Sequence, residues 1–385
     1  MTVLSPGKRW AGDFHYWVSA ALALALVPLL RELDLPTRFD WATLGSAYWL
    51  VLTAQSGFVA TLLYLIGGAP AITFSPLLQR IRRDKIRIAL GLAFFLTLLW
   101  AFTWLKALVL TVDAIAVLEF RERSRSTARR TAALDILPPA IYLFAGLLMI
   151  FAYNDIIVSV RFFGATDSTF NAMDKWLLRG TSVCDLCHWA VRRFPVSFFR
   201  FLEFIYFGMF PQIGAALILT AVYSGRRRAL QFVGTILTAY YFALLLFFLW
   251  PSQGPYYLCP THFLEFHSSL KAYAAQRASL ANSLALWNHL RIRQISTDYY
   301  IAFPCMHIAQ PLVVMWFLRP WRRVLAALAA YDLLLLVAIV LLEWHYVVDI
   351  FAGVLVAGVA ILVIDGHAAL QAASVMKMPA GVPSS

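Results

Sequence analysis

The sequence is poor in cysteine and in charged residues, and both shortages narrow the class of protein. Its 385 residues include four cysteines, too few for the disulfide framework of a small secreted domain. Charged residues make up 14% of the chain, against about 25% in soluble domains. The first residues lack the charged segment, short apolar run and small-residue cleavage site of a secretory signal. We therefore expect the first apolar segment to be retained.

Apolar residues, in contrast, are abundant. They account for 61% of the chain, above the roughly 45–50% that is usual in soluble domains. Apolar runs recur with the length of about 20 residues that a helix needs to cross about 30 Å of hydrocarbon, so we expect eight or nine spans. The net charge of +12 comes from arginines clustered between apolar runs, which is typical of membrane loops and headgroup contacts. Nucleic-acid binding is therefore not expected.

The pattern of apolar runs predicts an all-α, polytopic membrane helix bundle in four parts. Residues 1–160 carry amino-terminal transmembrane helices of unknown role, and 161–198 form an amphipathic connector on the membrane surface, with a helix at 168–179. Residues 199–366 form a core, and 367–385 a flexible tail. The predicted spans are 14–30, 41–66, 88–112, 134–158, 199–223, 230–250, 307–318, 324–342 and 345–365.

Two short basic loops predict the orientation of the second half of the chain. Arginines gather at 226–228 and again at 319–323, and such loops are usually cytoplasmic. Alternation of spans then places residues 251–300 and 343–345 on the extracytoplasmic side, which is periplasmic or lumenal.

A histidine and an aspartate stand four residues apart at the start of the last predicted span. On a helix, His345 and Asp349 would lie one above the other on the same face. If Asp349 accepts the proton of one ring nitrogen, the other nitrogen of His345 is free to attack phosphorus. Taken alone, the pair would more readily be interpreted as two residues that satisfy each other at a helix end.

A second motif precedes the predicted span at 307–318. Pro304 suits the first turn of a helix, and His307 follows three residues later. Backbone N–H groups at a helix start bind phosphate, and a histidine beside them can protonate a leaving oxygen. By itself, His307 would be interpreted as a lone interfacial histidine.

Together the two motifs resemble the second and third signatures of the phosphatidic acid phosphatase type 2 superfamily. The pattern is Pro304-x-x-His307, a basic turn, one intervening span, and then His345-Tyr346-x-x-Asp349. The resemblance covers about residues 199–365 and extends weakly to 171–180. It implies a six-span catalytic core within 199–366.

The resemblance also implies a role for each motif residue. The later histidine of the family is a nucleophile that forms a phosphohistidine, which corresponds to His345 here. Its orienting aspartate corresponds to Asp349, and the general acid corresponds to His307. The chemistry implied needs no metal and no cofactor.

The chain also departs from the family pattern. Cys305 stands where the family has a serine, Ile339 replaces the usual arginine, and the lysine-containing first signature is not found. Residues 250–257 instead resemble the proline-rich segment of the branch that contains inositol phosphorylceramide synthase, whose members transfer a phosphoalcohol headgroup between lipids. Tyr256 in this segment and Cys305 are therefore candidate substrate-binding residues, and Arg291 and Arg293 are candidate phosphate-binding cations.

The favoured function is thus headgroup transfer through a phosphohistidine-type intermediate, from a phospholipid or polyprenyl phosphate donor to a lipid hydroxyl acceptor in the membrane. Hydrolysis of a lipid phosphate or polyprenyl diphosphate by the same residues, with water as acceptor, is the alternative. A catalytically silent lipid-binding protein is a third possibility, because Cys305 and the missing cations weaken the phosphate site.

The cysteines admit several interpretations. Cys184-x-x-Cys187-His188 matches the spacing of covalent c-type haem attachment, which would make the protein an electron carrier. A local disulfide or simple packing of these cysteines is the other interpretation. Cys259 and Cys305 flank the segment before His307 and are a further candidate disulfide pair.

Overall fold

A computed structural model describes residues 14–32, 59–60, 127–160, 166–259, 270, 272–274, 276–277 and 302–366. Throughout these residues the regular elements are helical, which agrees with the predicted all-α class. The predicted span at 88–112, and the one at 41–66 apart from residues 59–60, lie outside the described part. The helices are α2 (Phe14–Glu32), α8 (Thr127–Val160), α9 (Asp167–Leu177), α10 (Val183–Val191), α11 (Val196–Phe207), α12 (Met209–Leu249), α13 (Pro255–Leu258), α15 (Met306–Leu318), α16 (Arg322–Leu341) and α17 (Val347–Ile361).

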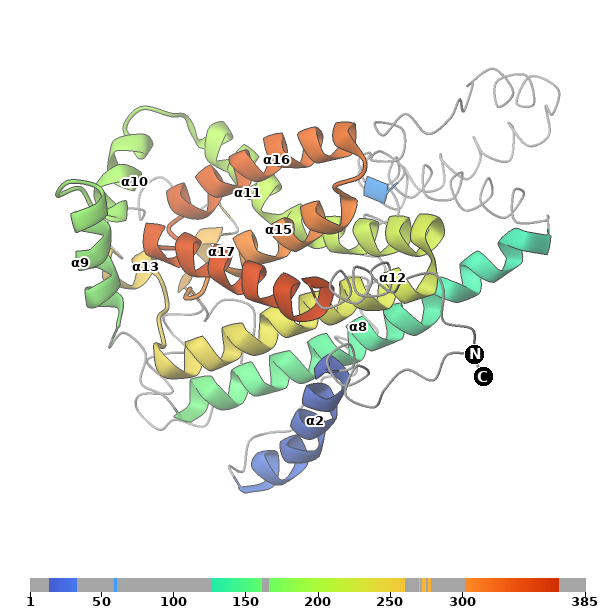
Figure 1. Cartoon of the computed structure of the whole chain (residues 1–385). Helices are drawn as coiled ribbons and strands as arrows, with labels where there is room; N and C mark the ends of the chain where they lie inside the picture. Colours follow the sequence, from blue (N-terminus) through green and yellow to red (C-terminus); the bar gives the residue numbers. More distant parts are fainter. Residues whose placement is uncertain are drawn as a thin grey trace, which may run out of the picture.

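The long helices form a bundle around α12 and α15. Helix α12 packs against α8 on one side and α15 on the other, while α15 also contacts α16 and α17 (Figure 1). Helix α11 lies along α16. The short helices α9, α10 and α13 gather at one end of this bundle, on the left of Figure 1. That end is where the two sequence motifs meet.

Three described stretches are long and apolar enough to cross a membrane. They are Val196–Leu249, Arg322–Leu341 and Val347–Ile364, and α15 is a shorter apolar helix. Their outer faces carry large apolar side chains such as Phe204, Leu333 and Phe351, which are 65%, 66% and 60% exposed. In water such faces would be unfavourable, whereas in a bilayer they meet hydrocarbon. The prediction of an integral membrane protein agrees with these helices.

The two predicted basic loops lie at the same end of the bundle. Gly225 interrupts α12 at φ 81°, a left-handed conformation that glycine adopts without steric cost. Beside it, the ring of Tyr223 lies 4.8 Å from that of Trp321. The Arg228 guanidinium lies 4.1 Å from the centre of the Phe317 ring. The basic residues that follow Gly225 and those around Trp321 therefore share one end.

The opposite end is closed by contacts between loops distant in sequence. The Ala302 N–H donates to the Ser252 carbonyl at 3.1 Å, and the Tyr256 N–H donates to the Glu343 carbonyl at 3.3 Å. These bonds join the segment after α12 to the segments before α15 and α17. The basic turns and the motif residues thus occupy opposite ends, the separation that the charge pattern predicts.

The cysteine pairing differs from the predicted alternatives. Cys184 on α10 forms a disulfide with Cys259 after α13, because α10 and α13 pack together and bring the two Cα atoms within 6.0 Å. Cys187 and Cys305 are free and buried. Pairing of Cys259 with Cys305 is therefore wrong, as is a local Cys184–Cys187 bridge. With the Cys184 thiol in a disulfide, the motif at 184–188 cannot make both thioether bonds to a haem.

Removing this disulfide is expected to lower stability without changing the fold. It closes a loop of 75 residues, and cross-links of this kind contribute about 2–4 kcal/mol. Cys184→Ser should therefore melt at a lower temperature than the wild type in detergent. Cys187→Ala, which removes a buried free thiol from the same helix, is the matched control. Equal melting temperatures for the wild type and Cys184→Ser would contradict the expectation.

Candidate active site

His345 lies in the turn before α17 and not within the helix. Helix α17 begins at Val347. Asp349 is the third residue of this helix, and its carboxylate caps the helix start by accepting the Tyr346 N–H at 2.8 Å. The expectation that His345 and Asp349 share a helical face is therefore wrong. The side chains meet nonetheless, with 3.5 Å between Nδ1 of His345 and the Asp349 carboxylate.

The second motif is also shifted relative to its helix. Helix α15 begins at Met306 with Cys305 as its N-cap, so Pro304 precedes the first turn that it was predicted to occupy. The Cys305 N–H donates to the Asp349 carbonyl at 3.1 Å. A Cβ at Gly353 would stand 2.4 Å from the Cys305 carbonyl oxygen. A glycine is needed there because α17 packs directly on the turn that carries Cys305.

The imidazole rings of His307 and His345 face each other. Nδ1 of His307 lies 3.1 Å from Nε2 of His345, and Nδ1 of His345 lies 2.7 Å from the Ala302 carbonyl. A carbonyl can only accept, so Nδ1 of His345 carries a proton and donates it. The Nε2 atom of His345 then points at His307, and a single proton lies between the two rings. The tautomer is the one that leaves Nε2 available for chemistry.

His345, Asp349 and one nitrogen of His307 are shielded from water. His345 is 2% exposed, Asp349 is fully buried, and Nε2 of His307 is a buried atom with no hydrogen-bond partner among the described residues. Electrostatic interactions are stronger in such a site than in water. An unpaired buried nitrogen is also costly, so a ligand that hydrogen-bonds to His307 would relieve that cost.

Three aromatic rings form a row beside His307. Tyr206 from α11 stacks on His307 with ring centres 4.3 Å apart, and Trp344 stacks on Tyr206 at 5.6 Å. Tyr256 in turn packs on Trp344 at 5.6 Å and is 2% exposed. Tyr256, a predicted substrate-binding residue, thus reaches His307 through two other rings.

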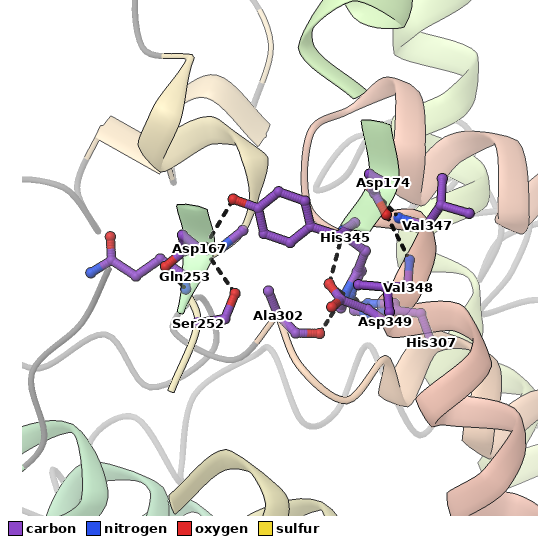
Figure 2. A network of polar contacts seen from close by, with 12 residues as sticks. Asp167, Asp174, Ser252, Gln253, Ala302, His307, His345, Val347, Val348 and Asp349 are labelled. Atoms are coloured by element: carbon purple, nitrogen blue, oxygen red, sulfur yellow. Dashed lines mark hydrogen bonds and ion pairs between the residues drawn. The ribbon is translucent and has the colours of Figure 1, made fainter. Parts of the chain in front are cut away.

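Helix α9 supplies a buried carboxylate that holds the proline-rich segment in place. Asp167 accepts hydrogen bonds from the Ser252 hydroxyl at 2.8 Å and from the backbone of Gln253 and Gly254 at 3.2 and 2.9 Å (Figure 2). The Tyr346 hydroxyl donates to the same carboxylate at 3.1 Å. Burial raises the pKa of Asp167, and these hydrogen bonds oppose the shift. One side chain therefore ties residues 252–254 to the turn that carries His345.

A second carboxylate on α9 caps α17. Asp174 accepts the backbone N–H groups of Val347 and Val348 at 2.8 and 2.9 Å. Burial raises the pKa of Asp174, and the two hydrogen bonds lower it in part. The start of α17 is thus occupied by a side chain and is not an anion site. The start of α15 is the helix end that faces the histidines.

Loss of the Asp174 cap is expected to reduce activity. Asp174→Ala removes the hydrogen-bond acceptor of two half-buried N–H groups, which costs up to about 1–3 kcal/mol each, and the turn before α17 should loosen. We expect at least a tenfold loss of the activity proposed below, together with a lower melting temperature. Asp185→Ala, which removes the corresponding cap from α10, is the matched control. An equal activity for the two variants would contradict a positioning role for Asp174.

The structure brings together part of the predicted site. His307, His345, Asp349 and Cys305 meet within it, whereas Arg291 and Arg293 lie outside the described residues. Three contributors were missed: Asp167, Asp174 and the Ala302 carbonyl. A sequence signal existed for the two aspartates, because they recur seven residues apart on the face of α9 that also buries Phe170. No sequence signal exists for a backbone carbonyl.

An apolar hollow of about 570 Å³ opens between α9 and α17. Its walls include Met173, Trp176 and Phe351, and Val348 lines it directly next to Asp349 in the chain. Trp176 and Phe351 are 82% and 60% exposed. An apolar ligand that lay in this hollow would end beside the first turn of α17.

One protein family resembles the part of the chain that holds this site. Residues 186–363 match the family model of the PAP2 superfamily. The matched part of the chain runs from α10 to α17 and includes His307, His345 and Asp349. This similarity suggests a phosphatase- or phosphotransferase-type activity, and the branch that contains inositol phosphorylceramide synthase stays a prediction. No curated protein and no solved structure matches the chain.

Proposed function

We propose that the protein is a membrane enzyme that transfers a phosphoalcohol headgroup between lipids through a phosphohistidine-type intermediate. The observation that carries this proposal is the 3.1 Å contact between Nδ1 of His307 and Nε2 of His345, within the part of the chain that matches the PAP2 superfamily. Nucleophile, acid and orienting groups are thereby assembled in one buried site.

The first step forms the bond between His345 and phosphorus. Nε2 of His345 attacks the phosphorus of the donor lipid, and the bond from phosphorus to the leaving oxygen breaks. His307 gives its proton to that oxygen, so the donor leaves as a neutral alcohol. Asp349 and the Ala302 carbonyl hold the ring, and the carboxylate stabilises the positive charge that develops on it.

Substrate must open the contact between the two rings before this step. A nucleophile stands about 3–3.5 Å from the atom it attacks, and an acid about 2.6–3.2 Å from the oxygen it protonates. A phosphoryl group therefore does not fit between nitrogens that are 3.1 Å apart. His307 lies in the first turn of α15 and is the ring that moves aside, since two acceptors hold His345.

The second step regenerates the enzyme. A lipid hydroxyl attacks the phosphorus, His307 takes the hydroxyl proton, and the bond between phosphorus and Nε2 of His345 breaks. His307 is then ready to act as acid again. Arg291 and Arg293, in the segment before α15, are the side chains that we assign to the phosphate oxygens. The charge pattern of the basic turns supports an extracytoplasmic site.

Two observations favour a lipid hydroxyl over water as acceptor. The nucleophile His345 is buried, and the apolar hollow beside Val348 suits an acyl or polyprenyl chain rather than a polar substrate. Hydrolysis of a lipid phosphate or polyprenyl diphosphate by the same residues is the second candidate. It is favoured by the match to the superfamily as a whole, and it differs only in the second step.

The test uses the purified full chain in detergent with labelled phospholipids and polyprenyl phosphates. Each donor is supplied with and without ceramide or diacylglycerol, beside a His345→Ala control. A new phospholipid that needs the acceptor and is absent from the control would support transfer. Free phosphate or phosphoalcohol formed without any lipid acceptor would support hydrolysis and contradict transfer. Formation of no product from any donor would contradict both functions.

A further inference from the structure

The two histidines and Cys305 form a group of potential metal ligands. The sulfur of Cys305 and one nitrogen from each of His307 and His345 all lie within 4.8 Å of one another. Both His345 and Cys305 are buried, and Cys305 is a free thiol. Thiolate and imidazole are the ligands that zinc prefers in proteins.

The distances are close to those of a tetrahedral zinc site. Zinc binds nitrogen at about 2.0–2.1 Å and sulfur at about 2.3 Å, so its ligand atoms stand about 3.3–3.7 Å apart. The nitrogens of His307 and His345 are already 3.1 Å apart, so they need to separate only slightly. The Cys305 sulfur lies within 4.8 Å of both nitrogens, and rotation of its side chain between staggered rotamers is the movement that would bring it to the metal.

The surroundings of His345 also suit a metal ligand. A ligating histidine usually donates its other ring N–H to a carboxylate or a backbone carbonyl, which fixes the ring and its tautomer. Here the Ala302 carbonyl accepts from Nδ1 at 2.7 Å, and the Asp349 carboxylate lies 3.5 Å from the same atom. The Nε2 lone pair therefore points toward His307, and the Cys305 sulfur lies within 4.8 Å of a ligand nitrogen of each ring.

The Cys305 backbone is held in place by α17. Its N–H donates to the Asp349 carbonyl, and its carbonyl packs on Gly353 at a distance that leaves no room for a Cβ there. The backbone of this ligand is thus preorganised, and only its side chain has to turn. A serine at this position would offer zinc a much poorer ligand than a thiolate.

We propose that zinc binds reversibly to Cys305, His307 and His345 and thereby inhibits the enzyme. The metal takes the Nε2 lone pair that attacks phosphorus and the nitrogen of His307 that carries the catalytic proton. Three protein ligands leave a fourth position for water or a phosphate oxygen. The inhibition of the enzyme by zinc rests on the proposed function, whereas the binding of zinc does not. Zinc is not a cofactor of the proposed reaction.

Binding is tested with Co²⁺ as a spectroscopic substitute for zinc on the purified full chain. Tetrahedral Co²⁺ with a thiolate ligand absorbs in the visible range and shows a sulfur-to-metal charge-transfer band in the near ultraviolet. We expect one Co²⁺ per chain, both signals, and their loss when Zn²⁺ is added. Cys305→Ser should lose the charge-transfer band, and Cys187→Ala, which removes the other buried thiol, should keep it.

A second ligand variant keeps the test decisive if Cys305→Ser does not fold. His307→Gln should retain a weakened charge-transfer band and bind Co²⁺ at least tenfold more weakly than the wild type. Absence of the charge-transfer band from the wild type would overturn the proposal. So would Cys305→Ser or His307→Gln with unchanged affinity and spectrum.

The link to activity is tested separately. Zinc should inhibit the wild type, a chelator should reverse this, and half-inhibition of Cys305→Ser should require at least tenfold more zinc. Transfer activity without a cobalt spectrum would overturn the metal site alone. A cobalt spectrum without any transfer or hydrolysis would leave the metal site intact and overturn the proposed function.

Discussion

Replacement of His345 by alanine is expected to lower headgroup transfer by about 10⁴-fold or more, the scale on which enzymes lose activity with their nucleophile. The ring is held at Nδ1 by the Ala302 carbonyl at 2.7 Å and directs Nε2 at His307. The neighbouring His307 is assigned to the leaving oxygen, so we do not expect it to replace His345 as the nucleophile. The measurement is the initial rate of product formation from a labelled donor.

The His345→Ala variant also allows a direct test of the covalent step. If His345 is a nucleophile, added imidazole should enter the vacated space, accept the phosphoryl group and restore part of the donor cleavage. The wild type should yield an acid-labile, alkali-stable phosphorylated protein after brief incubation with donor, and the variant should not.

The control for this variant is His188→Ala. His188 is the histidine of the 184–188 motif on α10, and it contributes nothing to the proposed reaction. We expect wild-type rates and normal labelling for it. Retention of most of the transfer activity in His345→Ala would exclude His345 as the nucleophile.

Asp349→Asn is expected to lower activity by about 10²-fold, less than the roughly 10⁴-fold loss when a serine protease triad loses its carboxylate. In such a triad the carboxylate alone fixes the histidine tautomer. Here the Ala302 carbonyl is closer to Nδ1 of His345, at 2.7 Å, than the Asp349 carboxylate is, at 3.5 Å. The tautomer should therefore survive the substitution, and the loss should come from the missing negative charge beside the ring.

Asp332→Asn is the matched control for this charge removal. Asp332 is a buried aspartate on α16 that accepts a hydrogen bond from Gln212 at 3.0 Å, a bond that asparagine can also accept. Its activity should stay within about twofold of the wild type, as expected away from the site. If Asp349→Asn lost as much activity as His345→Ala, then Asp349, and not Ala302, would set the tautomer. An unchanged rate for Asp349→Asn would remove Asp349 from the mechanism.

Much of the fold was accessible from the sequence because apolar runs report burial in lipid directly. The predicted spans at 14–30, 324–342 and 345–365 agree to within a few residues with α2, α16 and α17 with its continuation. The surface helix expected at 168–179 corresponds to α9. Gly225, whose positive φ breaks α12, stands where the first basic loop was expected.

Helix starts were predicted less well, since a cap depends on partners that a hydropathy pattern does not contain. His345 was expected inside the last span, but Asp174 and Asp349 together begin α17 at Val347. Asp174 lies 173 residues earlier in the chain than the N–H that it caps. A local pattern carries no information about a contact of that length.

The sequence by itself determined that this is a helical membrane protein and brought forward His307, His345 and Asp349, because span length and short motifs are local properties of the chain. Only the tertiary structure decided which atoms meet. The facing nitrogens of the two histidines, the Ala302 carbonyl and the Cys184–Cys259 disulfide all join residues 38 or more positions apart. Helix packing sets such contacts, and it depends on the whole set of side chains around them.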